Sequence, residues 1–169
     1  MFTIYVDADA CPVKDEVYRV AQRYEWKVVI AANASMWVPK NPLVELVVQA
    51  ASFNAVDDWI AENAGPGDIV VTADIPLAER CLQKQAKVID SKGRRFTDKD
   101  IGHMMATREI MNILRQNPMS ERHAGGPSAM TPRHRSNFLS QLDRSIHEVK
   151  KEIKRGEGRG SRGENENRV

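Results

Sequence analysis

The sequence predicts an α/β fold, with helices on both faces of a parallel sheet. The prediction rests on two kinds of segment that alternate along the chain. Through residues 2–89, short runs of apolar, often β-branched residues alternate with segments whose apolar residues recur at helical spacing. Strands that alternate with helices favour parallel pairing, because each helix returns the chain to the same end of the sheet. After this region the pattern changes, and two longer amphipathic helices are expected.

Five apolar segments predict the strands of this sheet. They cover residues 2–6, 27–31, 43–48, 68–72 and 88–89. The helices between them are predicted from apolar residues at helical spacing. They are a helix over 13–24, one that opens at Asn54, and one marked by Ala78, Cys81 and Leu82.

Two amphipathic helices are expected in the C-terminal half, separated by a long loop over 117–130 that contains Gly125-Gly126-Pro127. The methionines of the first helix are expected to fill the core, since Met suits irregular packing. Thr131 and Pro132 are expected to be the N-cap and first residue of the second helix. The apolar positions are Ile101, Met104, Met105, Met111 and Leu114 in the first helix, and Phe138, Leu142, Ile146, Val149 and Ile153 in the second.

The composition predicts one soluble, cytoplasmic domain over residues 1–155, followed by a disordered tail at 156–169 that contains arginine and glycine. No apolar run approaches the roughly 18 residues of a membrane span, and the N-terminus carries no basic leader. Cys11 and Cys81 lack the spacing of a zinc site, so both are expected to be core thiols in a reducing compartment.

Charge is distributed unevenly along the chain. Residues 1–91 carry 8 Lys and Arg against 13 Asp and Glu, whereas residues 92–169 carry 17 against 10. An acidic front half and a basic back half would suit a protein that holds cations and binds a phosphate backbone. An ordinary solvated surface with a basic tail explains the same asymmetry.

Three aspartates follow predicted strands. Asp7 and Asp9 come directly after the first strand, and Asp74 follows the strand at 68–72. Because the carboxyl ends of parallel strands open onto one edge of a sheet, these carboxylates are expected to converge there. Oxygen ligands of this kind suit Mg²⁺ or Mn²⁺. Each aspartate also precedes a predicted helix, so helix capping is the alternative.

The segments Val6-Asp7-Ala8-Asp9-Ala10-Cys11-Pro12 and Val71-Thr72-Ala73-Asp74-Ile75-Pro76-Leu77-Ala78 resemble the bacterial YaiI/YqxD family, which is grouped with the PIN-like nuclease folds. The resemblance extends to 32–35, 93–97, 107–109 and 125–127. It implies a three-layer, Rossmann-like α/β domain with an acidic pocket that takes Mg²⁺ or Mn²⁺.

Carried over residue by residue, this resemblance makes Asp7 and Asp74 the main acids of the pocket, with Asp9 and Asp57 as additional ones. Asn54 stands where the family often has an acid, and its amide brings no charge to a metal site. The alternative is that Asn54 caps its helix, as its residue type predicts. Candidate substrate contacts are Asn33, Ser35, Arg94, Arg95 and Arg108, since arginine offers bidentate geometry to phosphate oxygens.

The function expected from these residues is metal-assisted hydrolysis of a phosphodiester in nucleic acid, RNA in preference to DNA. A non-catalytic nucleic-acid-binding module is the first alternative, in which the basic half does the binding. An aspartyl phosphatase is the second, because Asp-x-Asp after a first strand also begins that chemistry, with Asp7 as nucleophile and Thr72 in a supporting motif. Dimerisation through the C-terminal helices stays open.

Overall fold

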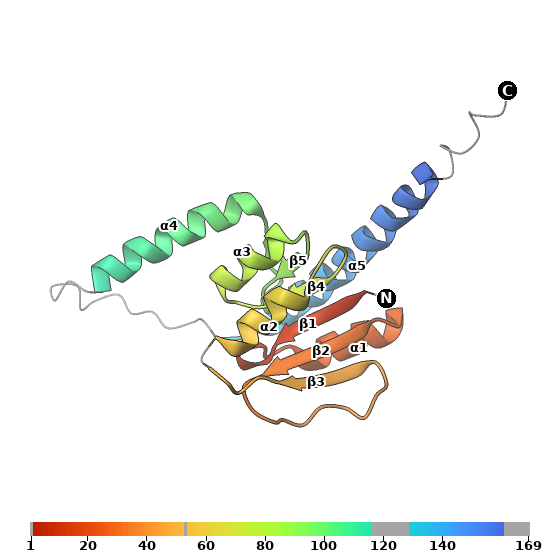
Figure 1. The fold of residues 1–169 in the computed structure, drawn as a ribbon, viewed down its shortest axis with the longest axis horizontal. Helices are drawn as coiled ribbons and strands as arrows, with labels where there is room; N and C mark the ends of the chain where they lie inside the picture. Colours follow the sequence, from red (N-terminus) through yellow and green to blue (C-terminus); the bar gives the residue numbers. More distant parts are fainter. Residues whose placement is uncertain (1, 53, 116–128, 161–169) are drawn as a thin grey trace.

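The computed structural model describes residues 2–52, 54–115 and 129–160. These residues form three layers, with a six-stranded sheet between two layers of helices, as the sequence predicts (Figure 1). The strands are β1 (Thr3–Asp7), β2 (Lys27–Ala32), β3 (Val44–Val48), β4 (Ile69–Val71), β5 (Lys87–Ile89) and β6 (Arg95–Phe96). The helices are the short 3-10 helix η1 (Ala8–Ala10), α1 (Lys14–Tyr24), α2 (Ala55–Asn63), α3 (Ile75–Gln83), α4 (Asp98–Arg115) and α5 (Pro132–Gly160). Among the described helices, none is both long and apolar enough to cross a membrane.

The strand order is β3-β2-β1-β4-β5-β6, and all neighbours are parallel except β5 and β6. The antiparallel β6 departs from the parallel sheet expected from the sequence. A tight turn causes the reversal, because Asp90 Oδ1 accepts hydrogen bonds from the backbone N–H groups of Lys92 (2.9 Å) and Arg94 (2.8 Å). The chain then runs back along β5 after a turn of only five residues, from Asp90 to Arg94.

Successive strands are added first on one side of β1 and then on the other, so β1 and β4 lie at the topological switch point of the sheet. Strands β2 and β3 are added on one side of β1, and β4 and β5 on the other. In open α/β sheets of this kind, the crevice for ligands lies outside the carboxyl ends of the two strands at this switch point. The topology therefore marks the carboxyl ends of β1 and β4 as the place to look for a site.

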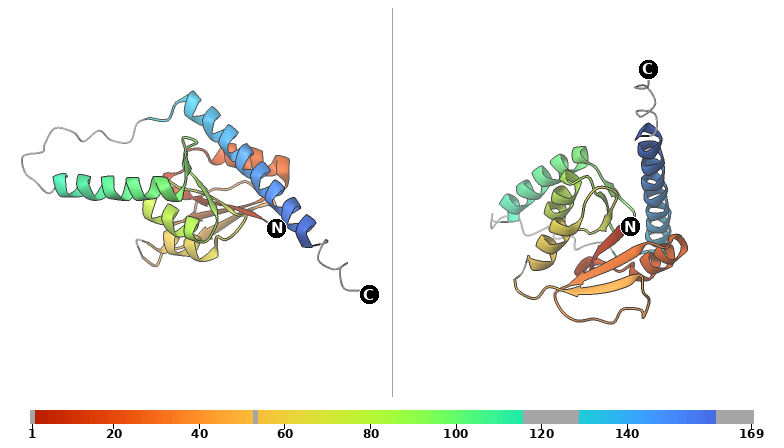
Figure 2. Two further views of the ribbon diagram at one scale, coloured as in Figure 1. Left: turned by 90° about the horizontal axis from the view of Figure 1, so that it is seen from above. Right: turned by 45° about the vertical axis from the view of Figure 1, so that its right-hand side comes forward.

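The two faces of the sheet bury different helices (Figures 1 and 2). Alternate residues of β1 explain this, since Ile4 and Val6 belong to one core cluster and Tyr5 packs against the other. The first cluster holds the apolar faces of α1 and α5, and the second holds those of α2 and α3 together with Ile101 at the start of α4. Both cysteines are buried in these cores, as predicted.

Helix α5 packs along the sheet as the apolar spacing predicts. Phe138, Leu142, Ile146 and Val149 are fully buried. Thr131 caps the helix as expected, with its hydroxyl oxygen accepting a hydrogen bond from the His134 N–H at 3.2 Å. The helix continues to Gly160, five residues beyond the expected domain boundary, and residues 161–169 of the predicted tail lie outside the described part of the chain. Residues 117–128 of the predicted long loop also lie outside it.

Helix α4 differs from its sequence-based expectation. Ile101 is buried and Met104 and Met105 are partly buried in the core, but Met111 is 51% exposed. Figures 1 and 2 show the reason, because only the beginning of α4 lies beside α3 and the rest extends away from the sheet. The interpretation of Met111 as core filling is therefore wrong.

Gly93 in the β5–β6 turn is expected to be essential for stability. Its φ is +84°, and a Cβ there would lie 2.5 Å from the carbonyl carbon of Asn137 in α5. Gly93→Ala is expected to lower the free energy of unfolding by about 2 kcal/mol or more, because the backbone would have to move in both elements. Urea unfolding followed by circular dichroism measures this loss.

The matched control is Gly102→Ala in α4, where an added Cβ meets no atom within 4 Å. Alanine is favoured over glycine inside a helix by about 0.5–1 kcal/mol, so this variant is expected to be slightly more stable. Equal effects of the two substitutions would contradict the role assigned to Gly93.

Candidate functional site

Two aspartates lie at the switch point of the sheet. Asp7 is the last residue of β1, and Asp74 follows β4, which pairs directly with β1. The backbone N–H of Asp74 donates to the Thr72 hydroxyl oxygen at 3.0 Å, and the Thr72 hydroxyl donates to Asp7 Oδ2 at 2.9 Å. The ends of both strands are thus joined through Thr72.

Asp7 is almost completely buried, with 6% of its surface exposed. Burial raises the pKa of its carboxyl group above the ordinary value, because a charged group loses its hydration there. The hydrogen bond from Thr72 opposes this rise, and the neighbouring carboxylates of Asp9 and Asp74 add to it. The structure therefore holds a carboxylate in a place where its negative charge is costly.

Asp57 approaches the same position from α2. It lies in the first turn of that helix, which begins at the carboxyl edge of the sheet. Burial raises the pKa of Asp57 to about 6, and the charges of Asp74 and Asp7 contribute to the rise. Three acids from β1, α2 and the start of α3 therefore influence one another, as expected if they share a pocket.

Helix capping explains part of the pattern. Asp74 does cap α3, since its Oδ1 accepts a hydrogen bond from the Leu77 N–H at 2.9 Å. Asp7 makes no side-chain cap hydrogen bond, and the cap position of α1 is Val13 rather than Asp9. Asn54 occupies the cap position of α2 without a side-chain cap hydrogen bond. Capping therefore accounts for Asp74 and leaves Asp7 and Asp9 unexplained.

Asp9 lies in η1, beside the loop after β2. Its side chain is exposed, and its Oδ2 accepts a hydrogen bond from Asn33 Nδ2 at 2.6 Å. Asn33 is thus brought to the acidic edge, where it orients a carboxylate. Ser35 lies two residues further along the same loop and is exposed.

The donor set fits a divalent cation by chemistry. Its members are carboxylates, which are the oxygen ligands that Mg²⁺ and Mn²⁺ prefer. None of the four acids Asp7, Asp9, Asp57 and Asp74 forms an ion pair with a described Lys or Arg. Across the described residues, however, no three His, Cys, Asp or Glu side chains stand close enough to hold an ion as they are placed. Binding would require the acids to draw closer together.

Cys11 lies next to this edge but is not a nucleophile. Its side chain is buried, and burial raises the pKa of the thiol to about 11. The thiol is therefore protonated at neutral pH, which supports the interpretation of Cys11 as a core residue.

The predicted arginines separate into two groups. Arg94 and Arg108 line one pocket with a volume of about 630 Å³, which also includes Ile75, the residue after Asp74. Arg95 does not join them, because its Nη1 lies 2.7 Å from Glu148 Oε2 on α5. Arg94 is the last residue of the turn before β6, whereas Arg95 is the first residue of the strand and reaches α5.

Several residues of this pocket escaped the sequence reasoning. Those on α4 are His103, Met104, Thr107, Met111 and Asn112. Their spacing of three to four residues with Arg108 places them on one helix face, and that signal was available. The spacing of Met104 and Met111 predicts core packing instead, because the sequence does not show that α4 leaves the sheet.

The raised pKa of Asp57 predicts a pH-dependent stability. An unfolded Asp has a pKa near 3.9, so the folded state holds more protons between about pH 4 and 6, and stability falls as pH rises through that range. Asp57→Asn removes this effect. In EDTA, Asp57→Asn is expected to raise the free energy of unfolding by about 1 kcal/mol at pH 7.5, a value that allows for partial solvent screening of the charge. At pH 4 the substitution is expected to change the free energy of unfolding little. Urea unfolding at both pH values measures the difference.

Asp58→Asn is the matched control. Asp58 is exposed and pairs with Arg80 at 2.7 Å, so its loss is expected to lower stability by less than about 1 kcal/mol. A gain for Asp57→Asn that is the same at both pH values would contradict the electrostatic explanation.

The comparisons with known proteins agree with the sequence motifs. The chain matches the family described as "Uncharacterized BCR, YaiI/YqxD family" over residues 5–148. A UPF0178 protein of Bradyrhizobium sp. (strain ORS 278) is 49% identical over 150 residues, covering 89% of this chain and 90% of the relative. A UPF0178 protein of Rhodopseudomonas palustris (strain ATCC BAA-98 / CGA009) is 51% identical over 146 residues, which cover 86% of this chain and 90% of the relative. No solved structure matches the chain.

Proposed function

The chain belongs to the YaiI/YqxD family, and we propose that it is a divalent-metal-dependent phosphodiester hydrolase that acts on nucleic acid, RNA in preference to DNA. One observation carries this proposal. Asp7, Asp57 and Asp74 lie at the carboxyl edge of β1 and β4, where the charges of Asp74 and Asp7 add to the rise that burial causes in the pKa of Asp57, and no described cationic side chain forms an ion pair with any of the three. A cost in stability of this kind is retained where it serves binding or catalysis.

A bound cation would offset that cost. The residues that would hold it are Asp7, Asp57 and Asp74, with Asp9 at the exposed side of the pocket. When bound, Mg²⁺ or Mn²⁺ lowers the pKa of a water molecule and stabilises the charge that develops on phosphorus. The grouping of the YaiI/YqxD family with the PIN-like nuclease folds, which the sequence motifs imply, favours the same chemistry.

The protein's own residues would prepare this chemistry. Thr72 orients Asp7, and Asn33 orients Asp9, as outer hydrogen bonds commonly do for metal-binding carboxylates. The helices α2 and α3 both begin at this edge, and the positive ends of their dipoles favour negative charge there. Arg94 and Arg108 would draw the phosphate backbone to the neighbouring pocket.

Calorimetry and a cleavage assay on the full chain test the proposal. We expect Mn²⁺ to bind the wild-type protein at pH 7.5, and a labelled single-stranded RNA to be cut with Mn²⁺ but not with EDTA. Bound Mn²⁺ should also raise the free energy of unfolding, by about 2.7 kcal/mol at a hundred times its dissociation constant.

Other results would favour the two alternatives. RNA binding with a steep salt dependence, and no cleavage with Mn²⁺, would indicate a non-catalytic binding module. Turnover of p-nitrophenyl phosphate with an aspartyl-phosphate trapped on Asp7 would indicate a phosphatase. Either result would replace the hydrolase proposal.

A further inference from the structure

The pocket of about 630 Å³ beside the acidic edge has the mixed lining of a small-molecule site. It lies between the start of α3, the β5–β6 turn and one face of α4. Apolar side chains come from Ile75, Met104 and Met111, and positive charge comes from Arg94 and Arg108. Asn112 adds an amide that both donates and accepts hydrogen bonds.

The two arginines are available to an anion. Arg108 is exposed on α4. Arg94 Nη2 lies 4.0 Å from Asp100 Oδ1, but both side chains are more than one-third exposed, so this ion pair is weak. A phosphate would therefore displace Asp100 from Arg94 at little cost in free energy.

The apolar part of the pocket suits a flat heterocycle. Methionine side chains are flexible and polarisable and make favourable contacts with aromatic rings. Met111 is 51% exposed, Ile110 and Ile113 on the same helix are 57% and 62% exposed, and Met111 lies one helix turn from Arg108 in the pocket. Apolar contact and positive charge at this spacing match the base and the phosphate of one nucleotide.

We propose that this pocket binds a nucleoside phosphate, with its base against Met104, Met111 and Ile75 and its phosphate at Arg94 and Arg108. The proposal rests on the proposed function, because it supplies the substrate contacts of the same site. Ile75 directly follows Asp74, so a nucleotide held here would lie next to the acidic edge. The nucleotide could be free or part of a single strand, since both present the same chemistry.

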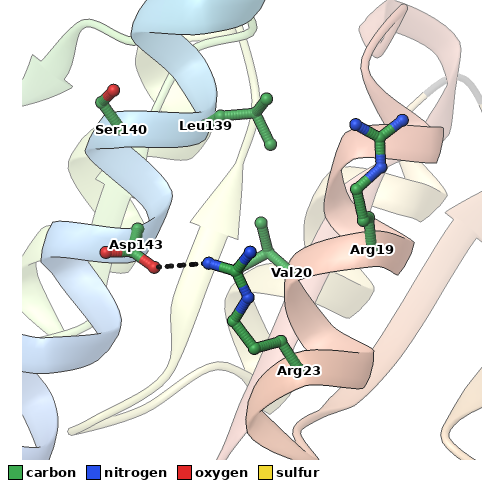
Figure 3. Close-up of a pocket in the computed structure, with 6 residues that line it drawn as sticks. All are labelled: Arg19, Val20, Arg23, Leu139, Ser140 and Asp143. Atoms are coloured by element: carbon green, nitrogen blue, oxygen red, sulfur yellow. Dashed lines mark ion pairs between the residues drawn. The ribbon is translucent and has the colours of Figure 1, made fainter.

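A second pair of arginines provides a control. A pocket of about 310 Å³ between α1 and α5 is lined by Arg19, Arg23 and Asp143, as Figure 3 shows. Asp143 lies 3.8 Å from Arg23 and partly neutralises it. This pocket lies on the opposite face of the sheet from α3, so Arg19 matches Arg108 in type and exposure but not in position.

Binding in EDTA tests the pocket separately from catalysis. The full chain is titrated with adenosine 5′-monophosphate, with ribose 5-phosphate, and with a labelled single-stranded RNA octamer. We expect the nucleotide to bind at least about tenfold more tightly than ribose 5-phosphate, since a base adds a stacking surface. Arg108→Glu should weaken binding at least about tenfold and reduce the salt slope for RNA by about 0.7, whereas Arg19→Glu should change neither.

A further variant tests the base contact. Met111 is exposed, so Met111→Ser is expected to fold normally, and because it adds no charge beside Arg108 it should weaken nucleotide binding while leaving ribose 5-phosphate binding unchanged. Equal affinities for nucleotide and ribose 5-phosphate, or equal effects of Arg108→Glu and Arg19→Glu, would overturn the proposal. RNA that binds at least about tenfold more tightly than the mononucleotide would identify a strand as the ligand, and similar affinities would identify a free nucleotide.

The two proposals fail in different ways. If the pocket binds as expected but Mn²⁺ produces no cleavage, the hydrolase is wrong and the nucleotide site stands as a binding site. If Mn²⁺ produces cleavage that Arg108→Glu and Met111→Ser leave unchanged, the nucleotide site is wrong and the hydrolase stands.

Discussion

Asp7→Asn is expected to abolish measurable Mn²⁺ binding and to lower Mn²⁺-dependent cleavage of single-stranded RNA by at least about a hundredfold. Asp7 is the most buried acid of the cluster, and the other acids lie at the start of α3, in the first turn of α2 and in η1. Asparagine keeps the shape and can still accept the hydrogen bond from Thr72, but it removes the charge that a divalent cation needs. Calorimetry and the cleavage assay measure both losses.

The same substitution should not destabilise the fold. Because burial raises the pKa of Asp7, its charge is unfavourable at neutral pH, and removing that charge is expected to leave stability in EDTA unchanged or higher. Loss of activity without loss of stability would separate a functional role from misfolding. Asp15→Asn, an exposed position in the first turn of α1, is the control and should cut RNA like the wild type. Undiminished cleavage by Asp7→Asn would contradict the metal site.

Phe138→Ala is expected to lower the free energy of unfolding by about 3–5 kcal/mol. Phe138 is completely buried where α5 packs against the sheet, and its truncation leaves a cavity that the rigid strands cannot close. A domain of this kind has a total stability of about 5–15 kcal/mol, so the variant should unfold at a much lower urea concentration. Chemical denaturation followed by circular dichroism measures the change.

Trp37→Ala controls for the loss of an aromatic residue. Trp37 is 79% exposed in the loop between β2 and β3, so its removal is expected to change stability by less than about 0.5 kcal/mol. If Phe138→Ala were equally mild, α5 would not be part of the folded core. The prediction therefore also tests whether the domain includes the chain after residue 128.

Periodicity predicted the strands and helices of this chain well where burial decides the pattern. The apolar spacing of Phe138, Leu142, Ile146 and Val149 predicted α5, and the structure buries all four. The short antiparallel β6 was not predicted, because two residues carry no period and the strand depends on the turn at Asp90. The prediction that Met111 fills the core was wrong for a related reason. An amphipathic helix has the same sequence pattern whether its apolar face meets a core or a pocket.

The candidate site was also predicted only in part from the sequence. Asp7 and Asp74 were predicted to meet because parallel strands end on one edge, and the pairing of β1 with β4 makes them neighbours. The approach of Asp57 depended on a family resemblance, and its interaction with Asp7 and Asp74 is visible only in three dimensions. Arg94 and Arg95 were equivalent in the sequence, yet only Arg94 reaches the pocket, while Arg95 pairs with Glu148.

The sequence by itself determined the α/β class, most of the elements and the edge at which the acids gather, since these follow from local periodicity and from the geometry of parallel strands. The tertiary structure alone decided which arginines line the pocket of about 630 Å³ and that α4 leaves this pocket open beside the start of α3. Those features depend on which residues distant in the chain come together, such as Ile75 and Arg108 around one pocket, and no local pattern of side chains determines that arrangement.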